Sequence, residues 1–232
     1  MSERINKIFT DVSKHYDFMN HLLSFGVDKN WRKEAVDLSV KLLDKIQSPK
    51  ILDVATGTGD LAIELSKKLS NKKSFHKIIA IDFNKEMLLL GKKKSERLKI
   101  KNISFEVKDA LKTKLPDESF DLSISGFALR NLDDLEVFAK EQKRILKKNG
   151  YFLYLDMAMP DGFSKRLFFQ AYSIFMKIIG FFVDYKAYSW LSNSISKFDK
   201  KKLLRILKDT GFKDIHYLEL KTGIAYIVYG KK

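Results

Sequence analysis

The sequence predicts an α/β fold, with one mostly parallel sheet, helices on both faces and an antiparallel hairpin at the sheet edge. Beyond about residue 50, short apolar runs rich in β-branched residues alternate with segments whose apolar residues recur three and four positions apart. Near the carboxyl end, two strand-like runs are separated by only two residues, which is typical of an antiparallel hairpin. Together these patterns predict about seven strands.

The individual elements follow from the same patterns. Parallel strands are expected at the short apolar runs, residues 50–54, 77–82, 103–107, 120–125 and 151–156. Helices are expected where the apolar residues form one face, at residues 60–70, 85–98 and 134–148. Asn149-Gly150 is expected to cap the last of these helices. The hairpin strands are expected at residues 213–220 and 223–229.

The whole chain, residues 1–232, is expected to form one domain, because it contains no internal repeat and no low-complexity linker. The alternating pattern defines a core at 49–156. Residues 1–48 are mainly helical in pattern and would form a lid, while 157–198, rich in Phe, Tyr and Trp, would form a helical cover. Residues 199–232 complete the domain with a helix and the hairpin.

Composition and charge exclude several classes of protein. The chain has no cysteine and four histidines, so no disulfide, thiolate metal site or cysteine nucleophile is possible and no metal site is predicted. Lys and Arg outnumber Asp and Glu by 44 to 29, a net charge of +15. Arginine, which reads bases through bidentate contacts, makes up only seven of these residues, so no nucleic-acid partner is predicted. The lysines form a solvated surface or contact an anionic membrane surface.

The polar amino-terminal residues contain no apolar signal-peptide segment, which predicts a cytoplasmic protein. The most apolar stretch, 167–183, is interrupted by Gln170, Ser173 and Lys177 and falls short of the roughly 20 apolar residues that span a bilayer. Peripheral contact with the inner membrane face is left open.

A glycine-rich turn carries the strongest functional signal. Asp53 ends an apolar strand, and Gly57 and Gly59 follow before a helix begins, so the backbone can approach a ligand closely. Ala62 replaces the third glycine of a dinucleotide motif, and the phosphate-binding Gly-Lys-Ser/Thr is absent. Asp82 ends the next strand, where a carboxylate can bind both hydroxyls of a ribose. An adenosine-containing cofactor is therefore predicted, and an ordinary strand-to-helix turn is the alternative.

The Asp-x-x-x-Gly-x-Gly turn with the acidic second strand resembles motifs I and II of class I S-adenosylmethionine methyltransferases. The resemblance implies their Rossmann-like sheet and S-adenosylmethionine as the cofactor. Lys108-Asp109-Ala110 resembles the position where these enzymes hold the adenine. The cofactor-binding residues that the resemblance implies are Asp53, Gly57, Thr58, Gly59, Asp82, Asp109, Ala110 and Ser125.

Three further segments resemble signatures of the demethylmenaquinone/ubiquinone methyltransferase family. They lie at residues 16–26 with Trp31-Arg32, at 126–134 and at 185–191. The last segment resembles the menaquinone branch of the family in particular. The resemblance spans nearly the whole chain and implies C-methylation of a prenylated quinol, first of all demethylmenaquinol. A ubiquinone-pathway substrate, another small molecule or lipid, and RNA are the alternatives, as is a non-catalytic binding module. Departures from the family pattern are Thr56 for a glycine, Asp156 for a glutamate and Val228 for a histidine.

Arg130 and Asn131 are the candidate catalytic residues, because they follow the carboxyl end of the fourth strand, where open α/β sheets bind ligands. Methylation of a ring carbon requires an electron-rich ring, which a deprotonated quinol supplies. The Arg130 guanidinium cannot act as a base, but it can hold the oxyanion or polarise a water molecule, with Asn131 fixing the geometry. The alternative is an ion pair of Arg130 with Asp133 or Asp134, and the identity of the general base is left open.

Substrate contacts are expected from the amino-terminal lid and the aromatic cover. Tyr16, Met19 and Asn20 belong to the first family segment and Tyr188 to the last, which suggests that they cover the cofactor and the quinol. Packing between helices is the alternative for these residues. The aromatic side chains of the cover suit a passage for the isoprenoid tail, and a homodimer is left open.

Overall fold

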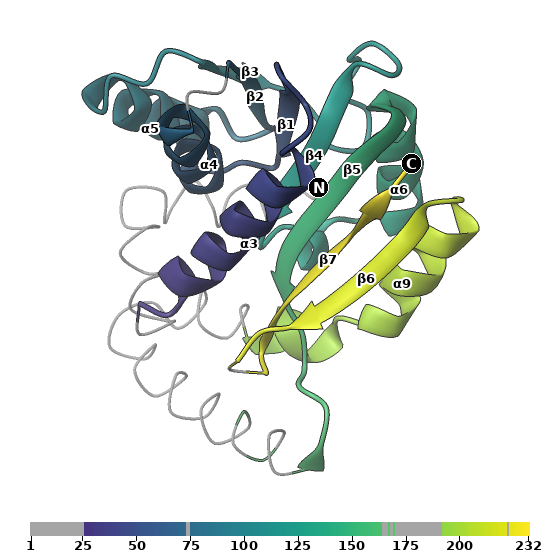
Figure 1. The fold of residues 1–232 in the computed structure, drawn as a ribbon. Helices are drawn as coiled ribbons and strands as arrows, with labels where there is room; N and C mark the ends of the chain where they lie inside the picture. Colours follow the sequence, from purple (N-terminus) through teal and green to yellow (C-terminus); the bar gives the residue numbers. More distant parts are fainter. Residues whose placement is uncertain (1–25, 73–74, 164–166, 168, 170–191, 222) are drawn as a thin grey trace.

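A seven-stranded sheet forms the centre of the protein (Figure 1). In this computed structural model the described residues are 26–72, 75–163, 167, 169, 192–221 and 223–232. The strand order is β3-β2-β1-β4-β5-β7-β6, in which the first five are parallel and β7 is antiparallel to both of its neighbours. The strands are β1 (Lys50–Val54), β2 (Lys77–Asp82), β3 (Ile103–Val107), β4 (Phe120–Gly126), β5 (Leu146–Met157), β6 (Lys213–Glu219) and β7 (Ala225–Lys231).

Helices cover both faces of the sheet, as the alternating pattern predicts (Figure 1). One apolar cluster joins α3 (Asp28–Leu42) and α4 (Asp60–Asn71) to one face. The other cluster joins α6 (Leu135–Ile145) and α9 (Lys200–Asp209) to the opposite face. The remaining helical elements are α5 (Lys85–Arg97) and the 3-10 turn η2 (Leu129–Asn131). The predicted fold class is therefore confirmed.

The boundary between α6 and β5 differs from the prediction. The helix ends at Ile145, and β5 begins at once with Leu146, which pairs with Phe120 before the register of the two strands shifts. Asn149 takes a left-handed φ of 62° at this irregularity, and a side chain on Gly150 would lie 3.1 Å from the carbonyl oxygen of Phe120. Asn149-Gly150 is thus a bulge within the strand. Its interpretation as a helix cap was wrong, because Asn-Gly suits both structures.

The carboxyl-terminal hairpin is confirmed, and β7 inserts between β5 and β6. Opposite residues on β5 and β7 include Asp156 and Tyr226, so their side chains lie on the same face of the sheet. At the end of the chain, the Lys232 ammonium donates to the Leu146 carbonyl oxygen at 2.8 Å. The hairpin is thereby joined to the start of β5.

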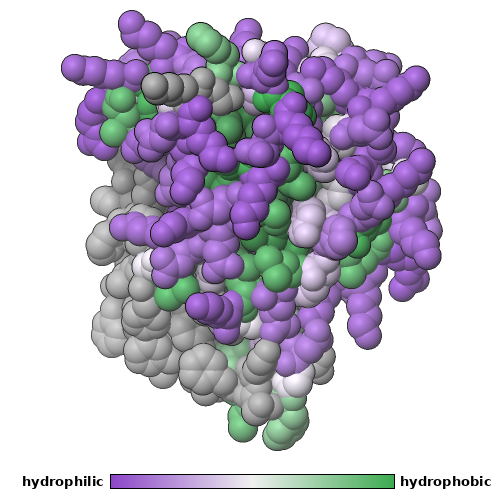
Figure 2. Space-filling model, in the orientation of Figure 1, coloured by the Kyte–Doolittle hydropathy of each residue, from purple (hydrophilic) through white to green (hydrophobic). Residues whose placement is uncertain are grey.

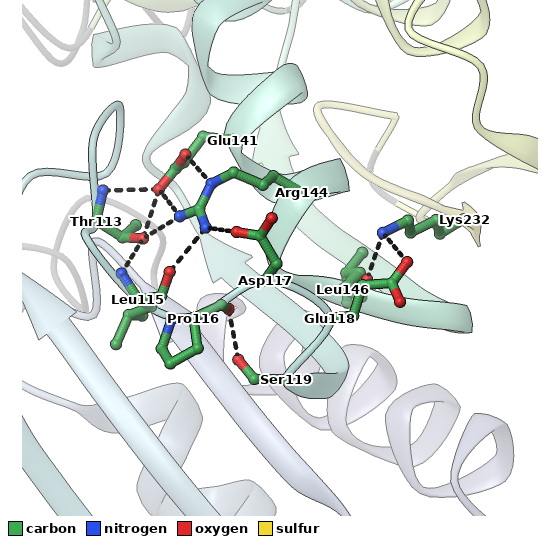
Figure 3. A network of polar contacts seen from close by, with 10 residues as sticks. All are labelled: Thr113, Leu115, Pro116, Asp117, Glu118, Ser119, Glu141, Arg144, Leu146 and Lys232. Carbon is green, nitrogen blue, oxygen red and sulfur yellow. Dashed lines mark hydrogen bonds and ion pairs between the residues drawn. The ribbon is translucent and has the colours of Figure 1, made fainter.

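A polar network holds the connection between β3 and β4 against α6 (Figure 3). The Arg144 guanidinium donates to the carbonyl oxygen of Leu115 at 2.8 Å and also pairs with Asp117. Glu141 accepts hydrogen bonds from the amide and the hydroxyl of Thr113 at 2.8 and 2.5 Å. The network lies where β4 begins, at the opposite end of the strand from Gly126 and η2. It therefore supports the fold and takes no part in the ligand site.

Hydrophilic side chains cover most of the face shown in Figure 2, with hydrophobic atoms between them. Within the described ranges, no helix is long and apolar enough to cross a membrane.

Candidate active site

The glycine-rich turn links the carboxyl end of β1 to α4, and its shape requires two glycines. Gly57 and Gly59 have φ values of 57° and 79°, in the left-handed region that other residues avoid. A side chain on Gly59 would also come within 2.9 Å of the Phe105 ring. The turn is anchored to β2 by the Thr56 amide, which donates to the carbonyl oxygen of Ile81 at 2.9 Å.

Asp82 connects this turn to the end of β2. Its carboxylate accepts hydrogen bonds from the amide of Gly57 at 2.8 Å and from the amide of Asn84 at 2.9 Å. Burial raises the pKa of Asp82, while these amides act in the opposite direction. The carboxylate borders a cavity, which leaves it accessible to the hydroxyls of a ligand. The other residues around the cavity are Ala55, Gly57, Phe83, Asn84, Met87, Gly126, Phe127, Ala128 and Asn131.

Asp53 borders a second cavity on the other side of the turn. One carboxylate oxygen accepts a hydrogen bond from the Thr56 hydroxyl at 2.6 Å. The other oxygen is buried without a hydrogen-bond partner among the described residues. Burial raises the pKa of Asp53 to about 7. A fully buried carboxylate with an unused oxygen is suited to binding a cationic group of a ligand.

The two cavities share four residues, Ala55, Gly57, Gly126 and Phe127, and so form one cleft at the carboxyl ends of β1 and β4. Ala55 and Phe127 have φ values of 53° and 61°, an unusual conformation for residues other than glycine. Strained backbone of this kind is often found at ligand sites. The cleft lies where open parallel sheets bind ligands.

Arg130 and Asn131 extend from η2 to different surroundings. The Arg130 guanidinium is paired with Asp156 of β5, whose side chain is fully buried, and its Nε donates to the Ser194 hydroxyl at 3.3 Å. The alternative of a pair with Asp133 or Asp134 is not what the structure shows, since Asp134 caps α6 through the amides of Glu136 and Val137.

Asn131 borders the cavity beside Asp82, and its side-chain oxygen is buried with no hydrogen-bond partner within the described part of the chain. Arg130 instead borders a wider polar groove, beside Ser194 and the start of α9. The predicted catalytic pair is therefore adjacent in sequence but is divided between the cleft and this groove. The pair's catalytic role stays a prediction.

The remaining candidates fall into three groups. Thr58 borders the cleft, and its hydroxyl accepts a hydrogen bond from the Lys94 ammonium at 2.8 Å. Asp109, Ala110 and Ser125 do not border either described cavity: the Asp109 carboxylate caps a turn through the Leu111 amide, and the Ser125 hydroxyl donates to the Val54 carbonyl oxygen. The substrate candidates Tyr16, Met19, Asn20 and Tyr188 lie outside the described residues.

Arg32, Asn84 and Met87 border the cleft but are not among the predicted site residues. Asn84 caps α5 by accepting the Met87 amide at 3.1 Å, a pattern that Asp-x-Asn directly before a helix could have indicated. Arg32 was noticed only as part of a family segment. No group of three metal-binding side chains occurs in the described ranges.

Several solved structures that share this fold are titled as S-adenosylmethionine-dependent methyltransferases. One from Aquifex aeolicus, titled a SAM dependent methyltransferase, aligns with a TM-score of 0.58 and 22% identity over 79% of this chain and 81% of its own. At this identity the likeness establishes the fold alone. The fold and the cleft at the strand ends together define the class I methyltransferase architecture.

The chain belongs to the ubiE/COQ5 methyltransferase family, whose model matches residues 1–232. A relative from Geotalea uraniireducens, the ubiquinone/menaquinone biosynthesis C-methyltransferase UbiE, is 34% identical over 99% of this chain and 97% of its own length. The demethylmenaquinone methyltransferase of Chlorobaculum tepidum is 36% identical over 96% of this chain and 90% of its own. The family predicted from the sequence motifs is confirmed.

Proposed function

We propose that this protein transfers a methyl group from S-adenosylmethionine to a ring carbon of a prenylated quinol, first of all demethylmenaquinol. The single observation that carries the proposal is the pair of buried carboxylates, Asp53 and Asp82, on the two sides of Gly57 at the strand ends. Family membership and the names of both relatives support the choice of a quinol.

The cleft fits the proposed cofactor in charge and in hydrogen-bonding groups. Asp82 would accept hydrogen bonds from the two ribose hydroxyls, and Asp53 would face a positively charged group. The carboxylates of Asp53, Asp60 and Asp82 surround the turn, so a pyrophosphate would be repelled there. When bound, S-adenosylmethionine supplies a methyl group activated by attachment to a sulfonium. The protein's tasks are then to align the acceptor carbon and to exclude water.

Arg130 is proposed to stabilise the quinolate oxygen. Nη1 of Arg130 donates to Asp156 and Nε donates to Ser194, so these two contacts fix the orientation of the guanidinium. Nη2 has no hydrogen-bond partner among the described residues. That nitrogen could donate to an oxyanion. The free oxygen of Asn131 could accept a hydrogen bond from the second quinol hydroxyl. The general base stays unassigned.

Membrane contact is proposed near residue 163. Phe163 and Leu167 are 85% and 57% exposed. A membrane-resident quinol would be most accessible to a protein that rests on the lipid surface. Flotation with anionic vesicles tests this contact, and Phe163→Ser should reduce the bound fraction. A homodimer stays a prediction, as does a cytoplasmic location.

The direct test measures transfer of labelled methyl from S-adenosylmethionine to a short-tailed demethylmenaquinol kept reduced. The oxidised quinone and a demethylated ubiquinol precursor serve as parallel acceptors. Product from the reduced naphthoquinol alone would support the menaquinone substrate and the need for an electron-rich ring. Product from both quinols would favour the broader activity named for the Geotalea uraniireducens relative. Cofactor binding without transfer to any acceptor would contradict the proposed substrate.

A further inference from the structure

Helix α9 carries the largest excess of basic side chains among the helices described above. Its ten residues include five basic ones and a single acid, Asp209. The next largest excess is on α5, where five basic residues stand against two acids. The helix packs against β6, on the outside of the hairpin (Figure 1). One edge of the sheet is therefore covered by a strongly basic helix.

Three of the basic residues form a stripe on the outer side of this helix. Lys201, Arg205 and Lys208 are four and three positions apart, so they lie on one side of α9, and all three are exposed. We call them the α9 stripe. No acid stands between them on the helix, and none of them forms an ion pair with another described residue. The opposite side of α9 is buried in the core through Leu203, Ile206 and Leu207.

Several cations of the other helices are neutralised by acids. The Lys68 ammonium of α4 lies 2.9 Å from the Asp37 carboxylate of α3, and the Lys94 ammonium of α5 lies 2.7 Å from the Asp60 carboxylate. The α9 stripe has no such compensation. Positive charges arranged in this way attract an anionic surface outside the protein.

Exposed apolar side chains are tethered beside the start of α9. The Lys200 ammonium lies 2.5 Å from the Asp161 carboxylate, and Asp161 is two residues from the exposed Phe163. Leu167, an aliphatic side chain that cannot stack on a base, is exposed as well. Cations beside exposed apolar side chains suit an anionic bilayer, where the cations meet the headgroups and the apolar groups enter the interface. The combination favours a lipid surface over a nucleic acid.

We propose that the α9 stripe binds the headgroups of an anionic lipid surface, next to the apolar contact made by Phe163. The inference rests on the proposed function, because a quinol with a long prenyl tail resides in such a surface. The polar groove that Arg130 borders is also lined by Asp199 and Lys202, at the start of α9. Docking through this helix therefore brings the groove close to the lipid that holds the quinol.

Flotation with vesicles of about one-third phosphatidylglycerol in phosphatidylcholine tests the stripe in the full chain. Lys201→Gln, Arg205→Gln and Lys208→Gln are combined in one variant, which removes three charges and keeps good helix-forming residues. The matched control removes three exposed charges from α5, which packs on β2 and β3 near the opposite edge of the sheet. Its substitutions are Lys92→Gln, Lys93→Gln and Arg97→Gln.

We expect the α9 variant to bind these vesicles about 100-fold more weakly, since each cation near an anionic surface contributes about fivefold in affinity. The α5 control should stay within about threefold, because charges more than about 10 Å from the surface are screened in 0.1 M salt. Binding of the unaltered protein should fall when the salt is raised to about 1 M. Methyl transfer to a short-tailed quinol in solution should be the same in all three proteins.

Equal losses in the two variants, or binding that does not respond to salt, would overturn the inference. The same proteins are also titrated with a single-stranded RNA, and an α9-dependent affinity for RNA without vesicle binding would overturn it too. Should the unaltered protein methylate the soluble quinol but bind no anionic vesicles, the inference would be wrong and the proposed function would stand. Should the vesicle pattern be found without methyl transfer to any quinol, the stripe would keep its role and only the proposed substrate would fail.

Discussion

Binding of the cofactor should depend on pH through Asp53. This carboxylate is fully buried, one of its oxygens has no partner among the described residues, and burial raises its pKa to about 7. In the ligand-free protein it is therefore largely protonated at pH 6. An ammonium group placed beside it favours the ionised form, so binding must release a proton at low pH.

The size of the effect follows from the pKa. With a pKa near 7, about one-tenth of Asp53 is ionised at pH 6 and about three-quarters at pH 7.5. If only the ionised form accepts the ammonium, the affinity for S-adenosylhomocysteine should rise about eightfold over this range. The range ends at pH 7.5 because an α-amino group itself begins to titrate near pH 8.

Isothermal calorimetry at pH 6 and 7.5, in buffers of different ionisation enthalpy, measures both affinity and proton release. Nearly one proton should be released at pH 6 and a small fraction at pH 7.5. Asp53→Asn cannot ionise, so its affinity should be low and independent of pH. An unchanged affinity of the native protein across this range, or an equal slope in Asp53→Asn, would refute the reasoning.

The same pKa sets the sign of a stability effect in the ligand-free protein. The folded-state pKa of Asp53 lies above the ordinary value near 4, so the folded protein binds the proton more tightly than the unfolded chain. The cost of burying the ionised carboxylate is therefore present above pH 7 and is relieved as the pH falls through 7 toward 4. Asp53→Asn should accordingly raise the melting temperature most at pH 8, a change that calorimetry can measure.

Three further substitutions test separate parts of the structure. Arg130→Ala should lower the rate of methyl transfer by at least about 100-fold with S-adenosylhomocysteine binding unchanged, and retained activity would reject its oxyanion role. Gly59→Ala places a side chain 2.9 Å from the Phe105 ring at a positive φ, so urea denaturation should show a loss of about 1 to 3 kcal/mol, and cofactor affinity should fall. Arg144→Ala removes its hydrogen bond to Leu115 and, because the side chain is about one-third exposed, should cost only about 1 kcal/mol, with methyl transfer per folded molecule unchanged.

The strands and most helix boundaries could be predicted because their signal is local. Residues 50–54 and 77–82 are predicted and observed as strands with the same ends, since buried parallel strands are continuous apolar runs. Residues 103–107 also keep their predicted ends, although this strand lies at the sheet edge and is only partly buried. The end of α6 was not predictable in this way. Its apolar periodicity continues past Ile145, and only the pairing of Leu146 with Phe120 ends the helix there.

In the candidate site too, contacts with a local sequence signal could be predicted and long-range contacts could not. Asp53, Gly57 and Asp82 belong to motifs that are short in sequence or lie at the ends of neighbouring strands, so their meeting could be predicted. The pair of Arg130 with Asp156 joins residues 26 positions apart, and the sequence favoured the nearer acids Asp133 and Asp134. Local spacing cannot indicate which carboxylate a buried guanidinium faces, because that choice depends on how η2 packs against β5.

Net charge is also a poor guide to this site. The chain as a whole carries +15, yet Asp53, Asp60 and Asp82 border the cleft at the glycine-rich turn. Arg32 is the cation among the described residues that border the cleft. Surface lysines are screened by solvent and salt, whereas buried carboxylates act on a ligand at short range and low dielectric. The negative charge around the cleft, and not the net charge of the chain, therefore determines which ligand the cleft favours. It favours a cofactor that carries a sulfonium and an ammonium, and it disfavours the polyphosphates that the total charge would attract.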